Sequence, residues 1–173
     1  MPIAQNMLNE FDNEMANTRK TLERLPEDKL EYKPDPKSMS LGRLAGHVTE
    51  MVTWGTVALT TDELDLNPAT YPSLHATSRE QILAEFDKNA KASRAALAAA
   101  TDEKMLGEWQ LKVNGKTMMA MPRVAVVRVM VMNHIIHHRA QLTVYYRLNG
   151  IPVPALYGPS ADEGMPLAAD AAA

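Results

Sequence analysis

The sequence predicts an all-α protein, a four-helix bundle with a small β-hairpin before the last helix. Four long segments carry apolar residues at helical spacing, and an Asn-Gly pair separates two short runs ahead of the last segment. Amphipathic helices of this kind bury their apolar faces against one another. The 173 residues suffice for one domain with a substantial core, which we assign to residues 1–167, with a flexible tail at residues 168–173.

The composition is that of an ordinary globular protein, with 46% hydrophobic and 23% charged residues. The net charge of -3 gives no reason to expect nucleic acid or an anionic membrane as a partner. No run approaches the roughly 18 apolar residues of a membrane span, and the N-terminus lacks signal-peptide features, so we expect a cytoplasmic protein. The absence of cysteine excludes disulfides, cysteine-ligated zinc and a cysteine nucleophile.

The first two helices are separated by a proline-rich connection. Helical periodicity over residues 3–25 predicts the first helix, and residues 26–39 hold three prolines and predict a loop. Ser40 is the expected N-cap of the second helix, which fades near Thr61. The polar residues and prolines within residues 62–77 predict a second loop.

The third helix and the hairpin follow. Ser78 is the expected N-cap of a helix over Arg79–Ala100. Asn114 and Gly115 lie between two short runs within Trp109–Met119, which is the strongest short signal for a hairpin. A lone hairpin is marginal by itself, so we expect it to pack on the helices.

The last helix is predicted to be a single one over Pro122–Leu148, because that run contains no internal glycine or proline. Asn149 and Gly150 supply the expected C-terminal stop. The proline-rich stretch at residues 151–159 cannot form a regular element, and we expect it to run extended along the bundle.

A pair of histidines on the last helix is the main functional signal. His134 and His138 are four residues apart, so they share one helical face and can bind one divalent metal ion. Their stripe carries apolar residues before and after them, which predicts that it faces the core, where two unbound imidazoles are costly. His47 lies on the inward stripe of the second helix. Taken alone it is better explained as a hydrogen-bonded core histidine, but the pair makes it the natural third ligand.

Other polar residues near these stripes have open assignments. Glu50, three residues after His47, could be a ligand or could bond the imidazole of a ligand, and an exposed helix glutamate explains it at least as well. His137 is one step off the stripe, which predicts the edge of the site or the solvent. His75 lies in a polar loop and is expected on the surface.

Two known metal-site patterns are disfavoured. A di-iron bundle of the ferritin type needs Glu-x-x-His on two helices, and this motif does not occur, nor does the run Pro122–Leu148 contain any carboxylate. The His-Glu-x-x-His signature of zinc proteases is also absent, because Ile135 occupies the glutamate position.

The run from Asn133 to Glu163 closely resembles the C-terminal signature of the DinB/YfiT-like metalloenzymes, the DinB superfamily. The stretch from Ser40 to His47 resembles that family's first histidine motif. The resemblance implies a four-helix bundle, commonly a homodimer, and one divalent metal ion (zinc, nickel or iron) bound by His47, His134 and His138. Characterised members include transferases and isomerases that use low-molecular-weight thiols.

Three functions are compatible with such a site. The first is a metal-dependent transferase that activates a low-molecular-weight thiol for transfer to an electrophilic small-molecule substrate. The second is a hydrolase that uses metal-bound hydroxide, and the third is a metal-binding stress protein without catalysis. Arg139 and Arg147 could hold an anionic group of a substrate, but ordinary surface positions explain them better. Trp54 and Tyr145 could line a pocket, although core packing is the better explanation.

Overall fold

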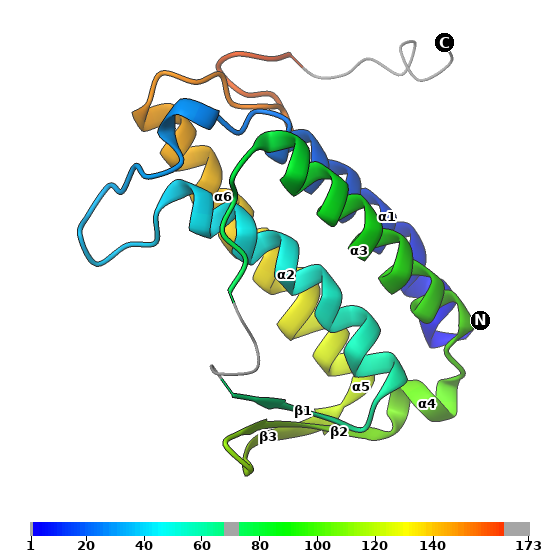
Figure 1. The fold of residues 1–173 in the computed structure, drawn as a ribbon. Helices are drawn as coiled ribbons and strands as arrows, with labels where there is room; N and C mark the ends of the chain where they lie inside the picture. The colour runs from blue at the N-terminus through cyan, green and yellow to red at the C-terminus, as the bar shows by residue number, and fades with distance from the viewer. Residues whose placement is uncertain (1, 68–72, 165–173) are drawn as a thin grey trace.

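The computed structural model describes residues 2–67 and 73–164, which form a mostly helical protein with a small three-stranded sheet at one end (Figure 1). The long helices are α1 (Ile3–Leu22), α2 (Leu41–Thr60), α3 (Arg79–Ala99) and α6 (His134–Leu148). The short helices in connections are η1 (Glu27–Lys29) and α4 (Asp102–Leu106). The predicted tail at residues 168–173 lies outside the described residues.

The long helices enclose one core. α3 packs against both α1 and α2, and α6 packs against the same two helices from the other side. Figure 1 shows α1 beside α3, with α2 beside the last helical run. Large apolar side chains in this core are fully or nearly buried, among them Phe11, Trp54, Phe86, Leu142 and Tyr146. No helix among the described residues is long and apolar enough to cross a membrane.

The predicted helix ends are largely confirmed. Ser40 Oγ accepts a hydrogen bond from the Arg43 amide at 3.3 Å and caps α2, and Ser78 Oγ caps α3 in the same way. Gly150 has a φ of 69°, a conformation that glycine adopts without strain, and its amide bonds the Arg147 carbonyl to close α6. The first helix ends at Leu22, earlier than its apolar pattern suggested.

The hairpin is confirmed, but it belongs to a larger sheet. Strands β2 (Glu108–Val113) and β3 (Lys116–Pro122) pair antiparallel around Asn114 and Gly115, which both have positive φ. A further strand, β1 (Glu63–Leu66), pairs parallel with β2, so the prediction of a loop there was wrong. The pattern of residues 63–66 could not reveal this strand, because it is only four residues long and its partner β2 comes after the long helix α3. The sheet is anchored by the buried Trp109, which packs against Ala58 and Val126.

The last helical run is continuous but not uniformly wound. It consists of α5 (Arg123–Ala125), a π-helical segment η2 (Val126–Asn133) and then α6. The prediction of one regular helix over Pro122–Leu148 was therefore wrong in its winding. The segment is rich in valine, whose branched side chain lowers the preference for α-helix, and apolar spacing does not distinguish the two windings. π-helical segments often occur at functional sites, and η2 leads directly into His134.

The segment after α6 crosses the ends of the helices instead of running along them. Glu163 pairs with Lys20 at 2.7 Å and with Arg24 near the end of α1. Asp162 pairs with Arg147 near the end of α6. The expectation that this stretch has no regular secondary structure is confirmed. These contacts tie the segment to the first and last helices, and its ribbon lies at one end of the molecule (Figure 1).

Candidate metal centre

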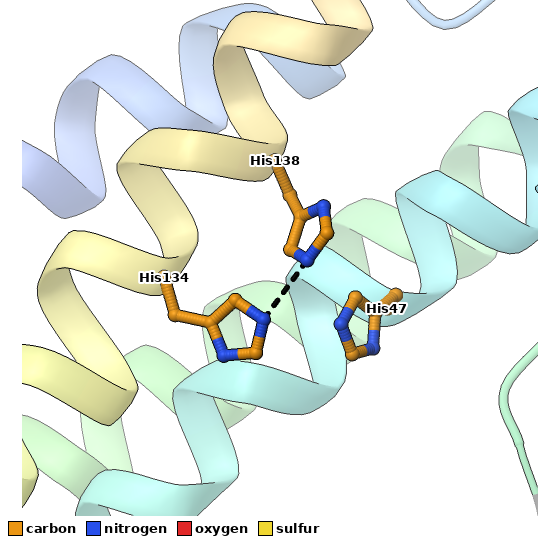
Figure 2. Close-up of side chains that lie close together, drawn as sticks. All are labelled: His47, His134 and His138. Carbon is orange, nitrogen blue, oxygen red and sulfur yellow. Dashed lines mark hydrogen bonds between the residues drawn. The ribbon is translucent and has the colours of Figure 1, made fainter.

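Three histidine side chains from two helices converge on one point (Figure 2). His134 and His138 stand one turn apart at the start of α6, with their Nε2 atoms 2.9 Å apart. His47 of α2 faces them, and its ring centroid lies 5.3 Å from that of His134 and 4.6 Å from that of His138. One nitrogen of each ring lies within 4.8 Å of the others. The three side chains could therefore bind one metal ion together.

A glycine next to His47 lets the loop before α3 lie directly on α2. A Cβ atom at Gly46 would stand 2.0 Å from the carbonyl oxygen of Leu74. Leu74 accepts a hydrogen bond from Arg43 at 3.3 Å through that oxygen, and its amide donates to Glu50. The close approach of the loop thus fixes the charged side chains around His47.

Glu50 lies next to His47 and contacts its imidazole ring. Its Oε2 atom is 3.6 Å from His47 Nδ1 and 3.1 Å from Nη1 of Arg43. The Glu50 side chain is only 12% exposed, so the explanation of an exposed helix glutamate was wrong. His47 Nδ1 is buried and has no hydrogen-bond partner within the described part of the chain, so the Glu50 carboxylate is the charge that faces it.

Gln141 orients His138, and the sequence interpretation overlooked it. His138 Nδ1 lies 2.7 Å from Oε1 of Gln141, which can only accept, so Nδ1 carries the proton. The lone pair of His138 then lies on Nε2, which faces the cluster. The amide nitrogen of Gln141 is 3.2 Å from His137 Nε2. The spacing of three residues from His138 is the signal that could have identified Gln141.

Burial keeps the paired histidines in the form that binds metal. Burial, together with the neighbouring imidazoles of His47, His134 and His137, lowers the pKa of His138 to about 4, although its hydrogen bond to Gln141 acts in the opposite direction. Burial also lowers the pKa of His134, with the charges of His47 and His137 acting in the same direction. Both rings are therefore neutral at pH 7 and offer a lone pair.

Glu50 is held in its ionised form. Burial alone would raise the pKa of this carboxyl group. The contacts with His47, with the Leu74 amide and with Arg43 outweigh burial and lower the pKa. A fixed negative charge therefore lies 3.6 Å from Nδ1 of His47.

A cavity of about 220 Å³ opens beside His138. Its lining comes from α6, from the start of α2 and from the loop before α2: Lys37, Ser38, Met39, Leu44, His138, Gln141 and Tyr145. The three loop residues were not anticipated from the sequence. Tyr145 does form part of this wall, whereas Trp54 is a core residue, as expected.

The remaining sequence candidates separate into surface and core. His137 and His75 are exposed, as predicted, and Arg147 pairs with Asp162 at the surface. Arg139 was wrongly expected on the surface. Its side chain is 1% exposed and pairs with the buried Glu14 of α1 at 2.7 Å.

The fold and the histidine cluster define a class of mostly helical proteins with a candidate three-histidine metal site. The model of the DinB family matches residues 1–167, and the chain belongs to that family. The chain is 29% identical over 157 residues to the uncharacterized protein YrdA of Bacillus subtilis strain 168, covering 90% of this chain and 89% of that protein.

Solved structures agree with this assignment. A DinB-like protein from Bacillus cereus ATCC 10987 has a TM-score of 0.67 and 26% identity, covering 88% of this chain and 97% of that one. A second DinB-like protein, YjoA of Bacillus subtilis, has a TM-score of 0.65 and 20% identity, covering 86% and 96% of the two chains. The second supports the fold alone.

Proposed function

We propose that the protein is a metal-dependent enzyme that activates a low-molecular-weight thiol for transfer to an electrophilic substrate. His47, His134 and His138 would hold one divalent ion, either zinc, nickel or iron. The observation that carries the proposal is a cluster of three imidazoles, free of carboxylate within the described residues, beside a cavity. A divalent ion in such a cluster keeps its full charge and lowers the pKa of a coordinating thiol.

The chain's own residues would prepare this chemistry. Gln141 accepts from Nδ1 of His138, so that the lone pair of His138 would face the ion, and the Glu50 carboxylate lies beside Nδ1 of His47. In the transfer, the thiol loses its proton to solvent, its sulfur forms a bond to the electrophilic carbon, and the leaving group departs with its electron pair. A chain without cysteine offers no internal thiol in competition.

The alternatives make different demands on the site. A hydrolase would benefit from a carboxylate within the cluster, but the cluster of the described residues consists of imidazoles alone, and Glu50 contacts Nδ1 of His47. A metal-binding protein without catalysis would enclose its ion, whereas this cluster borders a cavity. These two observations favour the transferase.

The test combines metal content with a thiol assay. Purified wild type should carry about one divalent ion per chain, and His134→Ala should lose it. The metal-loaded protein should transfer glutathione, bacillithiol or mycothiol to an aryl halide, with a rate that saturates with thiol, and His138→Ala should be inactive. Ester cleavage without thiol would support the hydrolase instead. Unchanged metal content in His134→Ala would overturn the metal centre itself.

We further infer the arrangement around this site. The long helices, which contact one another in the order α1, α3, α2 and α6, form a four-helix bundle. The protein acts as a homodimer in the cytoplasm on a small-molecule substrate. These inferences rest on the family and on the composition.

A further inference from the structure

The cavity beside His138 is preformed by the loop that precedes α2. The Tyr145 hydroxyl donates to the Met39 carbonyl at 3.3 Å, and the Tyr145 ring meets Tyr32 edge to face at 6.1 Å. The Ser38 amide bonds the Asp35 carbonyl at 2.9 Å and closes a turn. The loop is therefore tied to α6 at one point and to itself at another, and the cavity wall does not depend on a ligand.

The charge on the lining of the cavity is positive. Lys37 is the charged residue among the lining side chains, and the lining contains no carboxylate. The Lys37 side chain is exposed and makes no hydrogen bond or ion pair with the described residues, while the nearby Asp35 carboxylate accepts from the Lys37 backbone amide. A lysine without a partner, facing the same cavity as a candidate ligand of a divalent ion, favours an anion.

The other lining residues are both apolar and polar. Met39, Leu44 and Tyr145 supply apolar surface, Ser38 is the neighbour of Lys37 in the loop, and His138 belongs to the histidine cluster. The volume of about 220 Å³ equals that of roughly seven water molecules, which fits a short molecule or one end of a longer one.

We propose that the cavity selects thiols that carry a carboxylate a few bonds from the sulfur, held by Lys37 and Ser38 while the sulfur reaches the histidine cluster. This inference rests on the proposed function, because the cluster must hold an ion for the sulfur to bind. It adds the substrate class: a small mercapto-carboxylate, or the corresponding end of a larger thiol. Lys37 is a binding residue for specificity in this scheme, since it contacts the charged end of the substrate.

The test measures binding rather than turnover. Zinc-loaded wild-type protein is titrated by calorimetry, at low ionic strength, with mercaptopropionate, mercaptoethanol and cysteamine, whose thiols carry an anionic, a neutral and a cationic end. Wild type should bind mercaptopropionate about tenfold more tightly than mercaptoethanol, and cysteamine most weakly. The preference should shrink as salt is added, because Lys37 is exposed.

Two variants assign the preference to one side chain. Lys37→Met keeps the length of the side chain and should abolish the preference for mercaptopropionate while leaving mercaptoethanol binding unchanged. Lys33→Met changes an exposed lysine of the same loop that does not line the cavity, and it should keep the wild-type preference. Equal affinities of wild type for the three thiols, or an unchanged preference in Lys37→Met, would overturn the proposal.

The same titrations distinguish the metal site from the carboxylate selectivity. If none of the thiols binds more tightly with zinc than without it, the proposed function is overturned. If zinc strengthens the binding of all three thiols equally, the metal site stands and the carboxylate selectivity does not.

Discussion

The carboxylate of Glu50 lies 3.6 Å from Nδ1 of His47, the candidate ligand that α2 contributes to the histidine cluster. Arg43 and the Leu74 amide hold it there. Partners of this kind fix the ring orientation of a ligand and raise its basicity. The relationship makes Glu50 a positioning residue for the proposed metal centre.

The first prediction concerns this contact. Glu50→Gln keeps the shape of the side chain but removes its charge, so we expect zinc affinity to fall about tenfold. Glu85→Gln, which removes a carboxylate of α3 that lines the same surface pocket as Glu50, should not change it. A competition titration with a chromophoric chelator measures both variants, and equal affinities would contradict a role for Glu50.

The second prediction concerns the buried ion pair of Arg139 and Glu14. Arg139→Met leaves a buried carboxylate without its partner, so the free energy of unfolding should fall by about 3–5 kcal/mol. Removing both charges, with Glu14→Leu added, should restore part of the loss. Urea denaturation measures these values. Arg147→Met, which breaks a surface pair, is the control and should lose much less.

The third prediction concerns pH. In the unfolded chain His138 takes up a proton near its ordinary pKa of 6.5, whereas burial holds its pKa in the folded protein at about 4. Between these values the unfolded state binds more protons, so the stability of metal-free protein should decline as the pH falls from 6.5 to 4. Thermal unfolding across this range should show a shallower decline for His138→Gln. The exposed His75→Gln should behave like wild type.

The fourth prediction concerns the homodimer. The last helical run exposes Val129, Val144 and Leu148, which are 47%, 56% and 59% accessible. We expect light scattering to give twice the chain mass of 19.1 kDa, and Val144→Glu to shift the protein toward monomer. Met118→Glu, on the hairpin, is the matched control and should remain dimeric. A monomeric wild type would contradict the prediction.

Local chemistry explains which features the sequence predicts. The serine caps, the Asn114-Gly115 turn and the spacing of His134 and His138 each depend on residues a few positions apart, and the structure has all of them. Inward stripes on two helices also identified His47 as the residue that faces the pair. Whether these histidines bind a metal stays a prediction.

The features that the sequence missed depend on distant partners. Arg139 has its compensating charge 125 residues away on α1, so its burial could not be read from its neighbours. The strand β1 finds its partner β2 beyond α3. The loop that carries Lys37 is bonded to the last helix through Tyr145, which lies 106 residues from its partner Met39 in the sequence.

The π-helical winding of η2 has a consequence for how the molecule can vary. A wider turn absorbs a surplus residue, so the helix has one angular phase where Val126 meets the sheet and another where His134 meets α2. The direction in which the histidines point is therefore set separately from the direction in which Val126 points. Deletion of a single residue within η2 would rotate one half of the helix relative to the other. Either the contact of Val126 with the sheet or that of His134 with α2 would then be lost, although every side chain that forms these contacts remains present.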